Sequence, residues 1–107
     1  MYMRHGKMTA TPGNGAQLKE ILTAQGDGPL LDGCRLYLVA ADPTDGDVVW
    51  VTEVWETPQA HQDSLQDPRV RDLISRALPI LDREGLNSRE LEAVAGVPPR
   101  FGHFRGV

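Results

Sequence analysis

The feature that most constrains this chain is the segment Val48–Trp55, which is apolar on both of its alternating faces. Its β-branched and aromatic residues are typical of a strand. One face would carry Val49, Val51, Glu53 and Trp55, and the other would carry Trp50, Thr52 and Val54. A strand with one face in water would alternate polar with apolar residues. The segment therefore predicts a sheet that is covered on both sides.

Three further segments are predicted to be strands. Residues 34–41 are rich in apolar and aromatic side chains and reach 48–55 through a short turn that contains proline and glycine, so the two segments form an antiparallel hairpin. The chain opens with a strand over residues 2–11. It closes with a strand over residues 89–97, where small apolar residues occupy alternate positions.

Two helical regions separate these strands. The first follows the turn at residues 12–15, with Asn14 as its N-cap and Gly26 at its C-terminal end. Its apolar positions are Leu18, Ile21 and Leu22. The second region starts at Thr57-Pro58, an N-cap followed by proline at the first helical position, and gives a short helix over residues 58–66.

A longer helix is predicted from Pro68 onward, because Asp67-Pro68 repeats the same start signal. Its apolar stripe consists of Val70, Leu73, Ile74, Ala77, Leu78 and Leu81. We expect Pro79 to kink this helix, because its ring opposes the carbonyl of Ser75. Gly85 is expected to end it.

The order strand, helix, strand, strand, helix, strand predicts an α+β, ferredoxin-like βαββαβ fold over residues 1–97, with a tail at 98–107. Both helices of this fold cover the same face of an antiparallel sheet. The second apolar face then needs another cover, and a second copy of the chain is the simplest one. The sequence therefore predicts a homodimer in which two sheets pack face to face as a dimeric α/β barrel.

Composition argues against several other classes of protein. The net charge of −4 disfavours nucleic acid and anionic membranes as partners, because both require a basic surface. A single cysteine fits the reducing cytoplasm, and the start of the chain lacks the apolar stretch of a signal peptide. The three histidines lie far apart, and no Cys/His pair has a zinc spacing, so we expect no metal.

Residues 51–65, VTEVWETPQAHQDSL, resemble the antibiotic biosynthesis monooxygenase family, in which a strand ending in E-x-W/Y-E-S/T precedes a helix start that contains Ala-His. The turn Thr11-Pro12-Gly13 and the helical stretch that ends at Ala77-Leu78-Pro79 are similar to that family as well. The resemblance covers residues 1–97. It implies a dimeric α/β barrel with an apolar pocket between the sheet and the helices of each monomer.

Several members of that family oxidise phenolic or quinol-type aromatic compounds with O2, without flavin, haem or metal, so the resemblance implies no cofactor. A haem-degrading branch of the superfamily is the rival interpretation. Its asparagine, tryptophan and haem-ligating histidine would fall on Gly6, Ser64 and Ile74 or Ser75 in this sequence. None of these positions matches, so haem ligation is not expected.

His61 is the candidate catalytic base, because its ordinary pKa suits proton transfer near neutral pH and it is expected on the sheet-facing side of a helix. The candidate substrate-binding residues are Trp55, Tyr37, Arg4, Arg35 and Ser64. His61, Trp55, Tyr37 and the two arginines each have a structural alternative. His61 and Trp55 could simply pack in the core, and Arg4 or Arg35 could form a buried ion pair with Glu53.

Two functions follow from these residues. The first is a cofactor-independent monooxygenase that oxidises a phenol or quinol with O2. The second is a non-catalytic dimeric module that binds a small apolar ligand. A pocket of a few hundred Å³ lined by His61 and Trp55 would favour the enzyme. Large side chains that fill this space would favour the non-catalytic module.

Overall fold

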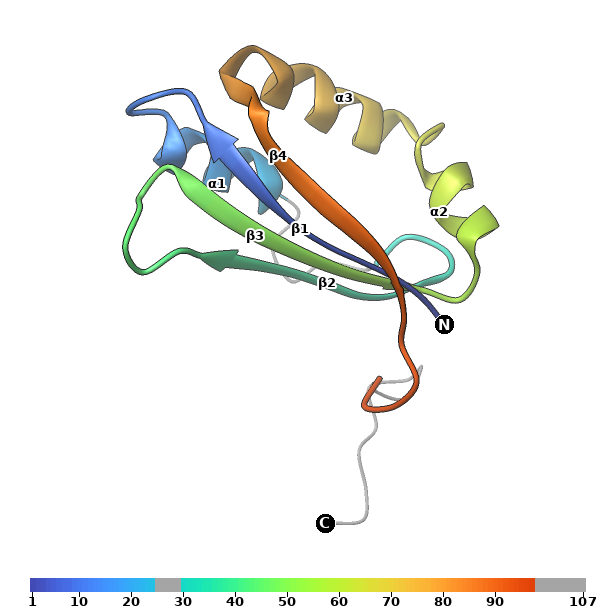
Figure 1. Ribbon diagram of the computed structural model, residues 1–107. Helices are drawn as coiled ribbons and strands as arrows, with labels where there is room; N and C mark the ends of the chain where they lie inside the picture. The colour runs from blue at the N-terminus through green and yellow to red at the C-terminus, as the bar shows by residue number, and fades with distance from the viewer. Residues whose placement is uncertain (25–29, 98–107) are drawn as a thin grey trace.

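Four antiparallel strands form one sheet in the order β2-β3-β1-β4 in the computed structural model, which describes residues 1–24 and 30–97. In chain order the elements are β1 (Tyr2–Ala10), α1 (Gly15–Leu22), β2 (Cys34–Ala41), β3 (Val48–Trp55), α2 (Pro58–Ser64), α3 (Pro68–Ala77), the short 3₁₀ helix η1 (Leu78–Ile80) and β4 (Leu81–Glu92). The helices lie on one side of the sheet (Figure 1). The predicted α+β, ferredoxin-like fold is confirmed.

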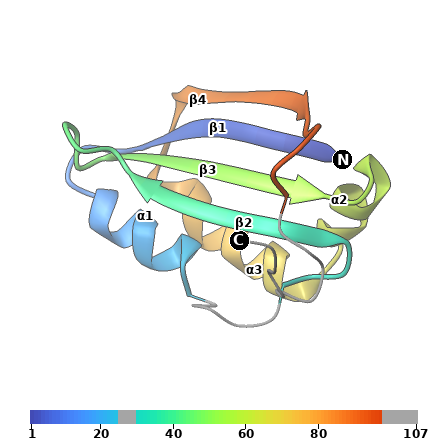
Figure 2. The ribbon, with the colours of Figure 1, turned by 90° about the horizontal axis from the view of Figure 1, so that it is seen from below.

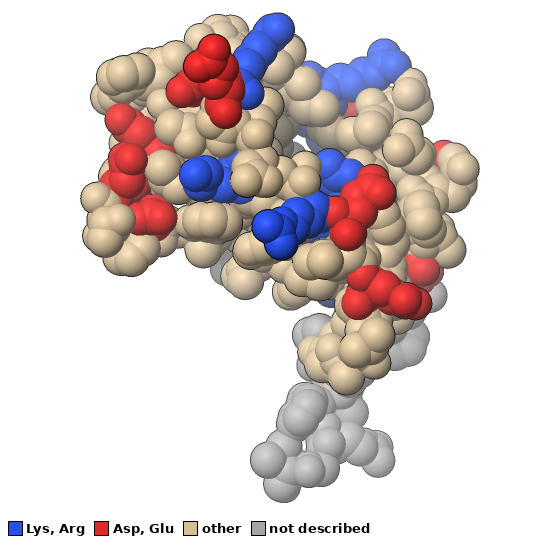
Figure 3. All heavy atoms as spheres, in the orientation of Figure 1, with Lys and Arg blue, Asp and Glu red and all other residues tan. Residues whose placement is uncertain are grey.

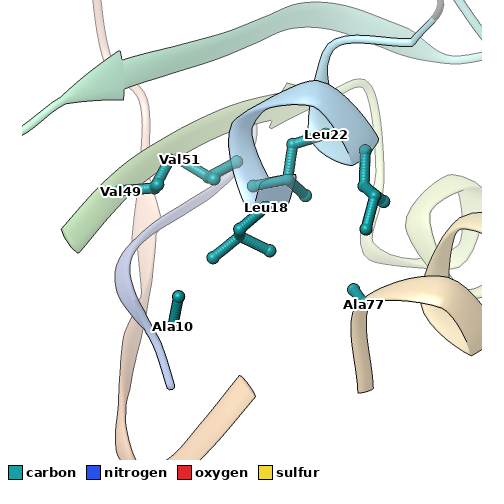
Figure 4. Close-up of a cluster of buried hydrophobic side chains, with 7 residues drawn as sticks. Ala10, Leu18, Leu22, Val49, Val51 and Ala77 are labelled. Atoms are coloured by element: carbon teal, nitrogen blue, oxygen red, sulfur yellow. The ribbon is translucent and has the colours of Figure 1, made fainter. Parts of the chain in front are cut away.

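The hydrophobic core lies between the sheet and helices α1 and α3 (Figure 4). Leu18 of α1 and Val49 of β3 are fully buried at its centre. Ala10, Ile21, Leu22, Val51 and Ala77 complete the buried cluster. The stripe predicted for α3 is buried only in part, because Ala77 and Leu73 reach the core while Ile74 and Leu78 are exposed.

Helix α1 begins where the sequence predicts, but a different residue caps it. Asn14 occupies the N-cap position, yet its side chain donates to Thr11 Oγ1 at 2.7 Å and does not cap the helix. The carboxylate of Asp47 accepts the backbone N–H groups of Gly13 and Gly15 at 3.1 and 2.9 Å. A carboxylate at a helix N-terminus satisfies free donors and complements the helix dipole. The hairpin turn therefore fixes the start of α1.

Helix α1 also ends earlier than predicted. Its last residue is Leu22, and the hydroxyl of Thr23 donates back to the carbonyl of Lys19 at 2.7 Å. The predicted terminator, Gly26, lies outside the described residues.

The predicted last helix and last strand were placed wrongly. Pro79 does not kink α3; the helix ends at Ala77, and Pro79 lies in the 3₁₀ turn η1. The chain then enters β4 at Leu81, so the strand spans Leu81–Glu92 and not residues 89–97. Gly85 ends no helix. It lies in β4, where a Cβ atom would stand 2.7 Å from the side chain of Thr9, next to a bulge in the β1–β4 pairing.

No helix of the described chain covers the sheet face opposite α1, α2 and α3. Figure 2 views the molecule from that side, where the segment that follows β4 crosses in front of one end of β1 and β3. The register places Leu38, Thr52, His5 and Arg89 in one row across this open face. Met3, Val54 and Leu36 form the row beside it, and Trp50 and Lys7 the row on the other side. Cys34 pairs with Trp55 across a bulge, so it belongs to the helix-covered face and not with Leu36.

Candidate functional site

Three aromatic side chains meet at the end of the sheet beneath α2. Tyr2 of β1 and Trp55 of β3 are paired residues of neighbouring strands, so their side chains share a face. The ring of His61 from α2 lies over them, with ring centres 5.8 Å from Tyr2 and 5.5 Å from Trp55. The contact with Trp55 is edge-on, at 71°. We call Tyr2, Trp55 and His61 the aromatic triad.

The start of α2 fixes the direction of His61. Thr57 Oγ1 accepts the backbone N–H of Ala60 at 3.0 Å, and Pro58 stands at the first turn, as the sequence predicts. One turn later His61 points to the sheet and is only 9% exposed. Its Nδ1 atom is buried and has no hydrogen-bond partner among the described residues. A buried polar atom of this kind is uncommon in a folded protein and indicates a functional constraint or an absent partner.

The charge state of His61 follows from its surroundings. Burial lowers its pKa below the ordinary value of 6.5, because imidazolium is poorly solvated there. The carboxylates of Glu53 and Glu90 act in the opposite direction, and Arg4 lowers the pKa further. The ring is therefore a neutral imidazole at pH 7, with a free lone pair that can accept a proton.

A polar network adjoins the aromatic triad. Arg4 Nη1 donates to the hydroxyl of Tyr2 at 2.9 Å and to Glu90 Oε1 at 3.3 Å. The Tyr2 hydroxyl donates to the same Glu90 oxygen at 3.0 Å. Glu53 Oε1 accepts the indole N–H of Trp55 at 3.1 Å. The salt bridge of Arg4 is therefore with Glu90, and not with Glu53 as in the structural alternative considered for Arg4.

Two hollows on the surface of the described residues are lined by side chains other than His61 and Trp55. One, of about 550 Å³, lies between α2, the start of α3 and residues 30–33, with Ser64 on its wall. The other, of about 650 Å³, lies between α1 and Arg76 of α3. The rings of Tyr2 and Trp55 pack against the His61 ring.

A family model for antibiotic biosynthesis monooxygenase matches residues 1–76, which is more than two thirds of the 107 residues. The chain belongs to the antibiotic biosynthesis monooxygenase family. The matched region includes the whole aromatic triad together with Arg4 and Glu53, whereas Glu90 lies beyond it.

Solved structures in this family share the fold. A proposed antibiotic biosynthesis monooxygenase from Chloroflexus aurantiacus is 40% identical, with a TM-score of 0.80 over 89% of this chain and 94% of that chain. Another, from Deinococcus radiodurans, is 26% identical, with a TM-score of 0.70 over 92% and 98% of the two chains. The comparison with curated proteins finds no match.

Tyr37, Ser64 and Arg35 are the other predicted site residues. Tyr37 shares the helix-covered face and pairs with Glu53 across the strands, but its hydroxyl donates to the carbonyl of Leu22 in α1 at 3.2 Å. Burial raises the pKa of Tyr37 to about 12, so its phenol stays protonated. Ser64 is buried, and its hydroxyl donates to the carbonyl of His61 at 2.6 Å. Arg35 contacts the sulfur of Met1 at 3.9 Å.

The residues aligned with the haem-binding pattern do not fit a haem site. A side chain at Gly6 would collide with β4, because a Cβ atom there would stand 2.7 Å from the carbonyl oxygen of Asn87 and from the Cβ atom of Ser88. Ile74 and Ser75 lie on the exposed side of α3. The described residues also contain no group of three or more His, Cys, Asp or Glu side chains placed to hold a metal ion. None of the described helices has the length and apolarity needed to cross a membrane.

Two members of the site, Tyr2 and Glu90, were not predicted. Tyr2 alternates with Arg4 on the first strand, which puts both on one face, and this spacing is the signal that could have identified it. Glu90 could not be identified in this way, because its partnership with Arg4 depends on the register between β1 and β4.

Proposed function

We propose that this chain is a monooxygenase that oxidises a phenolic or quinol-type aromatic compound with O2, with His61 as the general base. The observation that carries the proposal is the buried His61 ring, whose Nδ1 atom has no partner and whose pKa is lowered. A neutral imidazole in an apolar surrounding can accept the proton of a phenol. The match to the antibiotic biosynthesis monooxygenase family supports the reaction class.

The chemistry needs little from the protein beyond this proton transfer. His61 takes the phenol proton, and the phenolate passes one electron to O2. The resulting radicals combine to form a C–O bond, and His61 returns the proton to the peroxide. Cleavage of the O–O bond with loss of the ring C–H proton releases water and leaves a quinone. One phenol and one O2 thus give one quinone and one water, with four electrons leaving the ring.

Three groups would assist these steps. The guanidinium of Arg4 stabilises the phenolate as it forms, because a cation beside an anion is favourable in a dry site. The rings of Tyr2 and Trp55 hold the aromatic substrate in a fixed orientation next to His61. Exclusion of water by these rings strengthens each electrostatic contact.

The working unit in this proposal is a homodimer formed through the open face. Leu38 is 53% exposed there and Leu91 is 44% exposed, and Trp50 and Met3 are half-buried between them. An exposed apolar patch of this kind on a small protein marks an interaction surface. A second sheet packed on this face would give the dimeric α/β barrel.

A non-catalytic ligand-binding module is the second candidate, and one observation favours it. Tyr2 and Trp55 pack directly against His61, and neither of the two hollows described above is lined by His61 or Trp55. In that case His61 would pack as a core residue, and a small apolar ligand would bind without reacting.

Oxygen consumption with labelled O2 separates the two candidates. The protein is incubated with a panel of naphthols and quinols under ¹⁸O2, and the products are analysed by mass spectrometry. The monooxygenase predicts one ¹⁸O atom in the quinone and one in water, at a rate above that of the same compounds without protein. Binding without ¹⁸O incorporation for every compound would leave the non-catalytic module.

A further inference from the structure

Two hydrogen-bond donors converge on a single oxygen atom at the edge of the aromatic triad. Tyr2 donates its hydroxyl proton and Arg4 donates an Nη1 proton to Glu90 Oε1, at 3.0 and 3.3 Å. Arg4 also donates to the Tyr2 hydroxyl at 2.9 Å, which fixes both groups relative to each other. A guanidinium and a phenol aimed at one point form a binding site for an anionic oxygen.

The carboxylate that occupies this point is held weakly. The side chain of Glu90 is 71% exposed and belongs to β4, an edge strand, whereas the side chain of Arg4 is 28% exposed and belongs to the central strand β1. Exposed ion pairs change an equilibrium constant by less than about sixfold. Glu90 can therefore rotate into solvent at little cost, while Arg4 and Tyr2 stay in place.

We propose that Glu90 occupies, and competes for, a binding site for the anionic oxygen of an aromatic ligand. Arg4 and Tyr2 are the anchor for this oxygen, and the rings of Tyr2, Trp55 and His61 lie beside it. The ligand class is a planar aromatic compound that carries a carboxylate or phenolate. This inference deepens the proposed function, because it assigns the anchor and the charge of the substrate at the same site.

The charges around the anchor require Glu90 to leave when the ligand binds. Arg4 is the cation of this network, and it already faces the carboxylates of Glu90 and Glu53. A third negative group at this point would face net repulsion. If the ligand oxygen replaces the Glu90 oxygen, the number of charges at the anchor does not change.

The test is an anaerobic fluorescence titration with 1-hydroxy-2-naphthoate, an aromatic carboxylate. The variant Glu90→Gln removes the competing charge and keeps the shape of the side chain, so we expect the dissociation constant to fall about three- to sixfold. The matched control is Glu84→Gln, an equal charge change at an exposed position of the same strand. The control should change the dissociation constant by less than twofold.

A neutral probe and two anchor variants complete the design. 2-Naphthol, which is uncharged at pH 7.5, should bind wild type and Glu90→Gln equally. Arg4→Gln and Tyr2→Phe should each weaken binding of the naphthoate by about tenfold or more. Circular dichroism of each variant checks that it is folded, and Arg4→Lys, which keeps the charge, should restore part of the affinity.

Three outcomes would overturn the inference: no saturable binding of the naphthoate to any variant, equal effects of Glu90→Gln and Glu84→Gln, or equal gains for the neutral and the anionic probe. Because the titration contains no O2, its result is separate from the reaction. Tighter binding by Glu90→Gln without ¹⁸O incorporation would support the anchor and reject the proposed function. The opposite pair of results would reject the anchor alone.

Discussion

On each face of the sheet one histidine packs against one tryptophan, and the two pairs differ in the hydrogen bonding of the histidine ring. On the open face, His5 stacks on Trp50 with ring centres 5.6 Å apart, and its Nδ1 atom lies 2.9 Å from Thr52 Oγ1. On the helix-covered face, His61 meets Trp55 edge-on, and its Nδ1 atom has no partner in the described chain. Among the described residues, the Nδ1 atom of His5 therefore has a hydrogen-bond partner and the Nδ1 atom of His61 has none.

The difference separates a packing role from a chemical one. A half-exposed ring with a hydrogen-bond partner costs little to maintain and suits a surface that another molecule covers. A buried ring with an unsatisfied nitrogen costs free energy, and such costs concentrate at functional sites. On the side of the molecule seen in Figure 3, basic and acidic side chains are interspersed and form no single basic patch.

The strongest test of this comparison exchanges each histidine for glutamine. His61→Gln should lower kcat by about 10²- to 10⁴-fold, because glutamine cannot accept a proton as a general base. His5→Gln should leave kcat within about twofold, because Thr52 can still hydrogen-bond to the amide. Initial rates of ¹⁸O incorporation measure both variants. Equal losses in the two variants would mean that the unsatisfied nitrogen has no catalytic role.

A charge on the open face should affect assembly and spare the site. Trp50→Glu should weaken the dimer by about 100-fold or more, because truncated or charged aromatic anchors at the centre of an interface cost the most. Sedimentation velocity would then show the monomer mass of 11.8 kDa at concentrations where wild type sediments at twice that mass.

The matched control for the dimer is Leu78→Glu, which adds the same charge at a 43% exposed position in η1, on the helix side of the sheet. It should remain dimeric. A wild-type chain that sediments as a monomer at micromolar concentration, or a Trp50→Glu variant that stays dimeric, would show that the open face is not the interface.

Local patterns predicted most of the fold. The β-branched run of Val48–Trp55 and the start signals Thr57-Pro58 and Asp67-Pro68 each act within a few residues, so the sequence reveals them directly. The strand β4 did not follow such a pattern. Leu81–Glu92 is an edge strand with charged residues along most of its length, and the apolar alternation of a half-buried strand is absent. The pattern at its start therefore predicts a continuation of the preceding helix.

Site residues whose position is set by a single helix or strand could be predicted from the sequence. His61 and Trp55 follow from the phase of a helix and the end of a strand. The anchor formed by Arg4, Tyr2 and Glu90 depends on the register of two strands that are about 80 residues apart in the chain, with a bulge between them. No local pattern encodes that register.

We expect the buried His61 to make a smaller contribution, which is to the loss of stability at acidic pH. The pKa of His61 lies below 6.5 in the folded protein and at its ordinary value in the unfolded chain, so the unfolded chain binds more protons between these values. The stability that neutral His61 contributes is complete above pH 6.5 and is lost as the pH falls through the folded pKa. The melting temperature of His61→Gln should therefore fall less on acidification from about pH 7.5 to pH 5 than that of wild type. Parallel curves for the two proteins would show that His61 titrates as it does in the unfolded chain.

The smallest effect is expected at the other tryptophan. Asp42 accepts the backbone N–H and hydroxyl of Thr44 at 2.9 and 2.8 Å and the indole N–H of Trp50 at 3.1 Å. These hydrogen bonds lower the pKa of Asp42 to about 2, so its contribution to stability is present above pH 3.8 and is lost as the pH falls through about 2. Asp42→Asn should lower the melting temperature slightly at pH 7, because an amide offers one acceptor oxygen where the carboxylate offers two. In a Trp50→Phe background the hydrogen bond to the indole is already absent, so Asp42→Asn should lower the melting temperature by less than it does in wild type. Melting curves of wild type, the two single variants and the double variant form a double-mutant cycle that gives the coupling energy. A zero coupling energy would show that the hydrogen bond to Asp42 does not stabilise the Trp50 ring, and that the open-face pair depends on stacking and on Thr52 alone.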